Sequence, residues 1–154
     1  MRTLLASALV LLATPALAQE SGFMPYVGYN LDADDVLVGV GYRFGVTLPV
    51  PITVTAQPAV EYLFTDVDDV TVLQGDFNLT AALSASPALA PYVGAGLGLR
   101  YVDFDGDSET DLGLNLLGGV IFNPTGFGQP FAQARYTTGD GDALSLMGGV
   151  ILSF

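Results

Sequence analysis

The side chains of this sequence that could support chemistry are a few charges set inside otherwise apolar segments. They are Arg43, Glu61, Asp76, Arg100 and Arg135. The whole sequence contains no histidine and no cysteine, the residues on which most nucleophilic and acid–base sites rely. Glu61 and Asp76 could act as a carboxylate pair, but they are better explained as partners of the arginines. We therefore expect no enzyme activity and no cofactor.

A second candidate site is the acidic segment 103–111, in which carboxylates recur at alternate positions. Oxygen ligands at that spacing suit Ca²⁺, and the segment begins like an EF-hand loop. It then departs from that motif, because Gly106 stands fourth and Leu114 takes the twelfth place, where the motif has glutamate. The sequence thus predicts weak divalent-cation binding at most, and solvated acidic side chains are the favoured interpretation. The residues concerned are Asp103, Asp105, Asp107, Glu109 and Asp111.

The N-terminal segment predicts export. Arg2 supplies a basic start, residues 4–13 form an apolar run, and Ala16 and Ala18 give a small-x-small cleavage site. The run is too short to cross a bilayer as a helix. Residues 1–18 are therefore predicted to be a cleaved signal peptide, and residues 19–154 a single domain.

Composition restricts the class of that domain. The sequence has 16 acidic and 4 basic residues, which argues against nucleic-acid binding, because phosphate recognition needs clustered Lys and Arg. It is also 51% hydrophobic, yet no stretch after residue 18 could form a spanning helix. A large-cored soluble protein and a β-barrel in lipid both fit these facts.

Turn signals divide the domain into eight short segments rich in Val, Tyr, Phe, Thr and Gly, which predict strands. Most have about 10 residues or more, the length that a tilted strand needs to cross a bilayer. Eight strands are enough to close a small membrane barrel. The predicted strands are 23–30, 36–48, 52–64, 70–83, 92–102, 112–122, 131–137 and 143–154.

The connections between these segments alternate in character. Those after the first, third, fifth and seventh segments are rich in Asp and hold 13 of the 16 acidic residues. The others, at 49–51, 84–91 and 123–130, contain proline and no charge. An up-and-down antiparallel meander places odd connections at one end and even connections at the other, so the segregation predicts that topology.

Alternation along the strands indicates which face meets lipid. In the fifth segment Val93, Leu97 and Leu99 share one face, whereas Gly94 and Arg100 share the other. A soluble exterior would carry many lysines, and the sequence has none, so we expect the apolar face to point outward into lipid. Aromatic residues at strand ends on this face predict two girdles at the bilayer interfaces. They are Tyr29, Phe44, Tyr62, Phe64, Tyr101, Phe122, Tyr136 and Phe154. A soluble barrel stays open as an alternative, because alternation alone does not orient a closed sheet.

The eight-segment pattern and the last strand, which alternates apolar residues and ends in Phe154, resemble the small eight-stranded outer-membrane barrels of the opacity and outer membrane protein A transmembrane-domain type. The resemblance covers residues 19–154. It implies an all-β, eight-stranded antiparallel up-and-down transmembrane β-barrel in the outer membrane of a Gram-negative bacterium, with the acidic loops outside the cell. It also implies contact with outer-membrane lipid and lipopolysaccharide, and recognition of the terminal strand by the barrel-assembly machinery. No peptidoglycan-binding domain follows Phe154, so anchoring by that route is not expected.

All three arginines after residue 18 fall on the lumen face, as do Glu61 and Asp76. We expect the arginines to form ion pairs with these two acids, because burying an isolated charge in a dry lumen is costly. The favoured hypothesis is a structural or surface-interaction barrel with a charge-plugged lumen and an unknown extracellular partner. The first alternative is a narrow porin-like transporter of small or apolar solutes. The second is a soluble periplasmic carrier barrel.

Overall fold

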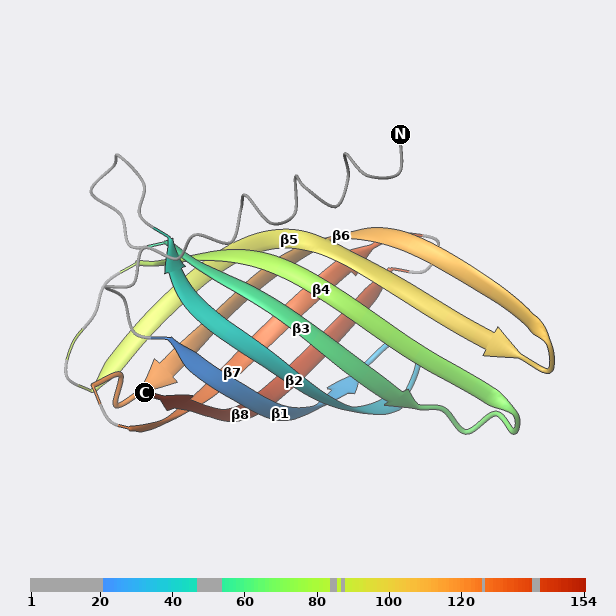
Figure 1. Ribbon diagram of the computed structural model, residues 1–154, viewed down its shortest axis with the longest axis horizontal. Helices are drawn as coiled ribbons and strands as arrows, with labels where there is room; N and C mark the ends of the chain where they lie inside the picture. Colours follow the sequence, from blue (N-terminus) through green and yellow to red (C-terminus); the bar gives the residue numbers. More distant parts are fainter. Residues whose placement is uncertain (1–20, 47–53, 84–85, 87, 126, 140–141) are drawn as a thin grey trace.

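The computed structural model describes residues 21–46, 54–83, 86, 88–125, 127–139 and 142–154. The predicted signal peptide, 1–18, and the predicted connection 49–51 lie outside these ranges. So do the ends of two predicted strands, at 47–48 and 52–53, and parts of the connections at 84–91, 123–130 and 139–142. The described chain forms eight strands that close into one barrel, with each strand hydrogen-bonded to the next and β8 to β1 (Figure 1). The strands are β1 (Gly22–Asn30), β2 (Asp35–Val46), β3 (Val54–Phe64), β4 (Val70–Ala82), β5 (Leu89–Phe104), β6 (Asp107–Phe122), β7 (Gly128–Thr138) and β8 (Ala143–Ser153).

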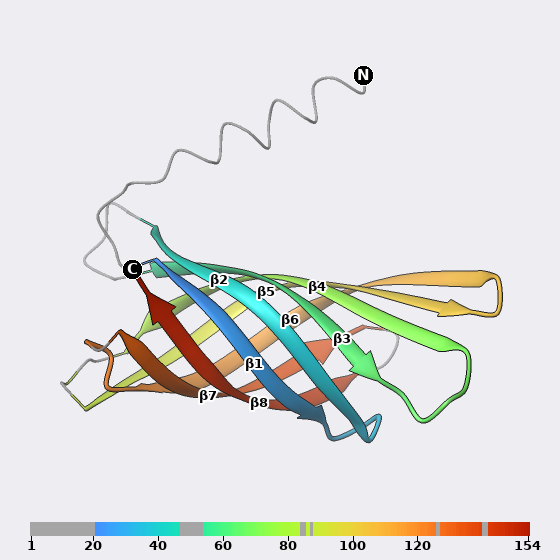
Figure 2. The same cartoon turned by 60° about the horizontal axis from the view of Figure 1, so that its bottom comes forward.

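Every neighbouring pair of strands is antiparallel, so the predicted all-β up-and-down barrel is confirmed. The connections β1–β2, β3–β4 and β5–β6 lie at the end of the barrel opposite the C-terminus in both ribbon views (Figures 1 and 2). The acidic connections therefore gather at one end, which we call the acidic end. Charge segregation along the sequence predicted this arrangement because a meander alternates its connections between the two ends.

The segment 103–111 is not a loop, and that part of the prediction was wrong. Strand β5 continues to Phe104 and β6 begins at Asp107, so only Asp105 and Gly106 form the turn. Both have positive φ, 43° and 101°, as a two-residue hairpin turn of type I′ requires. The polarity of these acidic residues is typical of a loop. A strand pair that projects beyond the rest of the sheet, however, needs no apolar face, and Figure 2 shows this hairpin extending beyond the other strands.

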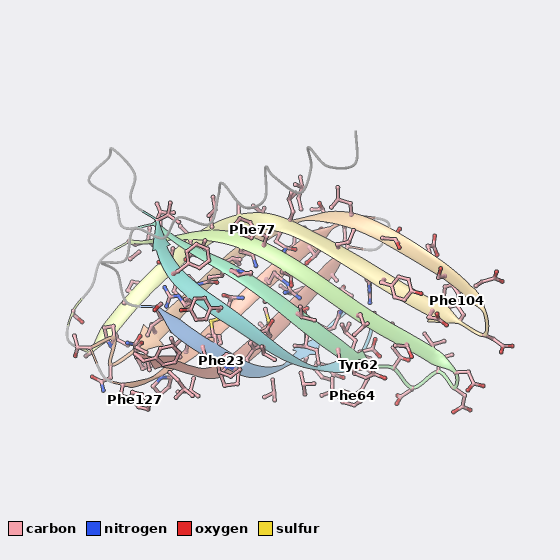
Figure 3. All side chains as sticks on the ribbon, in the orientation of Figure 1. Phe23, Tyr62, Phe64, Phe77, Phe104 and Phe127 are labelled. Carbon is pink, nitrogen blue, oxygen red and sulfur yellow. The ribbon has the colours of Figure 1, made fainter. Side chains whose placement is uncertain are left out.

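Side chains alternate between a packed lumen and an exposed exterior. In β4, for example, Gln74, Asp76 and Asn78 are buried, whereas Leu73 and Phe77 are exposed. Large apolar side chains are exposed on the barrel exterior, and Figure 3 labels Phe23, Phe64 and Phe77 among them. The barrel is thus inverted relative to a water-soluble protein, with its polar groups inside.

Glycines on the lumen face make room for the rings that fill it. A Cβ on Gly39 would lie 2.4 Å from the ring of Tyr26, and one on Gly119 would lie 2.5 Å from the ring of Tyr92. Each ring therefore lies over a glycine of the neighbouring strand, in space that any larger side chain at that position would occupy. Apolar residues also enter the lumen, among them Leu37 and Met147, which are fully or almost fully buried.

Candidate functional site: the charged lumen

The centre of the lumen holds an arginine bound by two carboxylates from across the barrel. Arg135 of β7 contacts Glu61 of β3 through Nη1–Oε1 and Nη2–Oε2, both at 2.7 Å. The same Nη1 lies 2.5 Å from Oδ2 of Asp76 on β4. The three residues are 3%, 1% and 5% exposed, so the contacts are shielded from solvent. The bidentate geometry with Glu61 is the strong form of an arginine–carboxylate contact.

Polar side chains from two further strands complete the hydrogen bonding of the carboxylates. The Tyr26 hydroxyl on β1 donates to Oε1 of Glu61 at 2.7 Å. On the other side, Asn115 of β6 donates to Oδ1 of Asp76 at 2.7 Å, and Gln74 donates to the same oxygen at 3.0 Å. The cluster, which we call the Arg135 cluster, joins β1, β3, β4, β6 and β7 through the interior. It therefore links strands that do not hydrogen-bond to each other directly, such as β4 and β7.

The cluster has one positive and two negative side chains, all desolvated. Burying such a set adds little net stability, because desolvation offsets much of the attraction, but leaving one member unpaired is strongly destabilising. Only the correct alignment of the strands brings all partners within hydrogen-bond distance. The arrangement therefore suits a role in setting the registry of the barrel and filling its lumen.

The other two arginines face the lumen, as predicted from alternation, but do not join this cluster. Among the residues that the structure describes, both lumen ion pairs belong to Arg135. Arg43 is paired in register with Gly22, near the end of the barrel that holds the C-terminus, and its guanidinium carbon lies 5.9 Å from the Tyr92 ring centroid. That distance allows a cation–π contact. Alternation determines that Arg43 and Arg100 face the lumen, but their positions along the barrel axis keep both arginines away from Glu61 and Asp76.

Arg100 lies nearer the acidic end, opposite Asp111 in the β5–β6 register. Both line a cavity of about 60 Å³ at this end, together with polar and small residues such as Gln74 and Thr137. Deeper in the barrel, a void of about 10 Å³ borders Arg135, Tyr26 and Gln133. That smaller space is barely the size of one water molecule, so no wide passage opens beside Arg135 at this point of the lumen.

Several lumen residues were not singled out from the sequence. Tyr26 and Asn115 belong to the Arg135 cluster, and Tyr92 donates through its hydroxyl to Gln133 Oε1 at 2.9 Å. Tyr92 and Gln133 stand on the same parity as Arg100 and Arg135, the lumen charges of their strands. Alternation could therefore have placed them in the lumen, although it could not show which partners they meet.

The acidic residues proposed as a weak cation site do not converge. Asp103 pairs with Ser108, whereas Glu109 pairs with Val102 and Asp111 with Arg100, so Asp103 lies on the face opposite to Glu109 and Asp111. Asp105 is in the turn and Asp107 pairs with Phe104. Within the described ranges, no group of three or more His, Cys, Asp or Glu side chains could hold a metal ion.

The aromatic residues predicted to form girdles lie at both ends of the exterior. Phe64, Phe122 and Phe154 are exposed, as are Tyr29, Tyr101 and Tyr136, while Phe44 and Tyr62 are half-buried. Three of the tyrosines at the acidic end also donate to nearby aspartates: Tyr29 to Asp34, Tyr101 to Asp103 at 3.1 Å, and Tyr136 to Asp142 at 2.6 Å. Each ring thus meets the apolar surface while its hydroxyl binds a polar group, the behaviour expected at a membrane interface.

In the described part of the chain, no helix is long and apolar enough to cross a membrane. No family model matches the sequence, and no curated protein matches it significantly. Solved structures do match the fold. The N-terminal β-barrel domain of Pseudomonas aeruginosa OprF superposes with a TM-score of 0.70 at 15% identity, covering 88% of this chain and 97% of that one.

Neisserial surface protein A gives a TM-score of 0.61 at 17% identity, covering 88% of this chain and 95% of that one. The outer membrane protein Ail of Yersinia pestis, in a phospholipid nanodisc, gives 0.58 at 18% identity, covering 88% and 99%. These likenesses extend over nearly the whole of each compared chain, although sequence identity is low. The chain therefore has the fold of the small eight-stranded outer-membrane β-barrels.

Proposed function

We propose that this protein is a non-enzymatic outer-membrane β-barrel with a structural or surface-interaction role, a lumen closed by charged side chains and an acidic end that faces outward. The observation that carries the proposal is the Arg135 cluster inside a barrel whose exterior is apolar. A sheet with this exterior is stable in hydrocarbon, because its backbone hydrogen bonds close around the barrel and its polar groups are turned inward.

The same proposal includes the route to the membrane. Residues 1–18 would direct export and be removed, and the strand that ends at Phe154 would be recognised by the barrel-assembly machinery. Lipid would contact the apolar exterior, and lipopolysaccharide the acidic end. The support for these steps is the sequence pattern and the likeness in fold to outer-membrane proteins.

Membrane placement is tested on outer-membrane fractions from cells that express the full chain. A folded barrel resists SDS until it is boiled, so we expect a band that shifts between unheated and boiled samples and that requires detergent for extraction. A protein that is released without detergent would instead support the soluble carrier. The cavities of about 10 and 60 Å³ give that alternative little room for a carried ligand.

A narrow transporter is the second candidate, and the cavity at Arg100 favours it, because this polar space opens the first part of a path from the acidic end. Passage of a solute would require the contacts of Arg135 with Glu61 and Asp76 to rearrange. Single-channel recording in planar bilayers separates the two functions. We expect no steady porin-sized conductance from the wild-type barrel, and such a conductance would overturn the proposed plug.

A further inference from the structure

Two prolines interrupt the hydrogen-bonded ladders of the barrel wall. The ladder between β1 and β8 skips residues 24–25, and the ladder between β2 and β3 skips residues 57–58. Each ladder resumes on both sides of its break. Proline has no N–H, and a closed sheet has no edge strand on which its missing donor would go unnoticed. Pro25 and Pro58 therefore each remove a hydrogen bond from within the wall.

The backbone around each proline shows that its nitrogen faces the interrupted side. The nitrogen and the carbonyl oxygen of a strand residue point to the same neighbouring strand. The carbonyl oxygen of Pro25 points at β8, because a Cβ on Gly149 would meet it, and a Cβ on Gly41 of β2 would lie 3.2 Å from the carbonyl oxygen of Pro58. Neighbouring strands are only about 4.8 Å apart, so no other segment of the chain fits between them to supply the missing donor.

The other two prolines in the described strands interrupt no ladder. Pro91 pairs with β6, and the ladder between β4 and β5 ends next to it at Tyr92. Pro130 pairs with β8, and the ladder between β6 and β7 ends next to it at Phe131. The two breaks consequently lie on the two sides of one hairpin, β1–β2, whose own ladder is continuous.

The breaks leave one end of this hairpin weakly attached to the wall. On the side toward the C-terminus, β1 keeps two residues paired with β8, Gly22 and Phe23, and β2 keeps three paired with β3, at 44–46. Figure 2 shows the two strands, blue and cyan, side by side at the front, with β8 next to β1. We call residues 22–25 and 42–46 the gate segment. Because few hydrogen bonds hold it, it can separate from β8 and β3 while the rest of the barrel stays closed.

The lumen behind the gate segment is apolar. Met24 is 4% exposed and belongs to one buried cluster with Phe131, Met147 and Ile151. The void of about 10 Å³ lies among these side chains, with Arg135 on its border. In the closed barrel this void is too small for a hydrocarbon chain, but methionine side chains are flexible and repack readily. A path through the gate segment therefore leads from the wall into the apolar lumen and stops at the Arg135 cluster.

The outside of the wall at the breaks is apolar as well. The outward positions of β1 and β2 carry only apolar and aromatic side chains. Val27, two residues from Pro25, is 61% exposed, and Val60, two residues from Pro58, is 60% exposed. A molecule that approaches the gate segment from outside the barrel is thus in contact with hydrocarbon-like surface, and so is one that has passed inside.

We propose that the gate segment swings away from β8 and β3 and admits an acyl chain of a membrane lipid to the apolar lumen. The two proline breaks permit the movement, and the apolar surfaces on both sides of the wall select a hydrocarbon chain over a polar solute. The inference rests on the membrane placement proposed above, because the chain comes from the bilayer. It goes beyond a structural role, since it gives the barrel a lipid-binding function.

Hydrogen–deuterium exchange tests the movement. The full mature barrel is placed in phosphatidylcholine nanodiscs, and exchange of the gate-segment amides is followed by mass spectrometry. In the variant Pro25→Val with Pro58→Val, each valine restores an N–H to its ladder, so we expect these amides to exchange about tenfold more slowly than in the wild type. The matched control is Pro91→Val with Pro130→Val, for which we expect less than a twofold effect. Equal slowing in both variants, or none in either, would overturn the gate.

Photolabelling tests the entry of an acyl chain. The nanodiscs then include a phosphatidylcholine with a diazirine near the end of one acyl chain, and adducts are located by mass spectrometry after irradiation. We expect adducts on the lumen-facing Met24 and Met147 of the wild-type barrel as well as on the outward Val27. In the variant Pro25→Val with Pro58→Val, the lumen adducts should fall about tenfold, in step with the slower opening, while the adduct on Val27 stays within twofold. Labelling of the wild-type barrel on outward residues alone would overturn the proposal.

The heat-induced gel shift of each purified variant confirms that it still folds, and labelling of the wild-type barrel decides the question without any substitution. Failure of the gel-shift experiment on outer-membrane fractions would overturn the proposed membrane placement. A heat-modifiable barrel without lumen adducts would overturn the lipid-binding function alone, so the two failures are distinguishable.

Discussion

Replacing Arg135 by methionine tests the account of the lumen most directly. The change removes contacts of 2.7, 2.5 and 2.7 Å and leaves two buried carboxylates facing each other without a cation. Removing one partner of a buried ion pair lowers stability by about 3–5 kcal/mol, and here a single substitution leaves two carboxylates without their cation. We therefore expect the free energy of unfolding to fall by about 3–5 kcal/mol at neutral pH.

The assay is urea unfolding of the barrel in phospholipid vesicles, followed by far-ultraviolet circular dichroism, because the sequence contains no tryptophan. The matched control is the triple variant Arg135→Met, Glu61→Gln and Asp76→Asn, which removes the carboxylates together with the arginine. We expect it to recover at least half of the lost stability, since neutral amides can keep hydrogen bonds with Tyr26 and Asn115. A loss below about 1 kcal/mol in the single variant, or no recovery in the triple variant, would refute the reasoning, because both follow from uncompensated buried charge.

Three further substitutions test other parts of the barrel by the same unfolding assay. Gly39→Ala places a Cβ against the Tyr26 ring and is expected to lower the free energy of unfolding by about 1–3 kcal/mol. Gly75→Ala is the control, because a Cβ at this position has no atom within 4 Å, and it should change stability little. Equal effects of the two substitutions would contradict the packing of the Tyr26 ring. Tyr26→Phe removes a buried hydroxyl that donates to a carboxylate and should cost about 1.5–3 kcal/mol, and an unchanged midpoint would show that this hydrogen bond contributes nothing. Leu97→Arg, at the middle of the exposed face of β5, should cost about 2–4 kcal/mol in lipid, against about 0–1 kcal/mol for Leu89→Arg at the start of that strand. Similar costs at both depths would argue against a bilayer around this surface.

The alternation of residue types predicted much of the fold before any tertiary contact was known. The alternation of Asp-rich and Pro-containing connections correctly predicted that the two kinds lie at opposite ends of the barrel. The reason is that successive connections of a meander lie at opposite ends. Parity also placed Arg43, Arg100 and Arg135 on the lumen face, since side chains of a strand point to alternate sides. These inferences needed only the local period of a β-strand.

The extent of β5 and β6 was not predicted. Segment 103–111 is as polar as a loop, and nothing in its composition shows that the two strands continue pairing up to Asp105 and Gly106. Hydrophobic alternation marks a strand only where one of its faces meets lipid or a core. Where both faces meet water, pairing depends on the partner strand, and the sequence signal for a strand is lost.

The sequence by itself determined the number of strands, the end at which the acidic residues gather and the face on which each lumen charge stands. Only the closed barrel decided which of those charges meet. Arg135 reaches Glu61 and Asp76 from the far wall, whereas Arg43 and Arg100 lie at other levels of the lumen. The position of a side chain along the barrel axis depends on the tilt of the strands and on the register stagger that closes the sheet, and both are properties of the whole barrel.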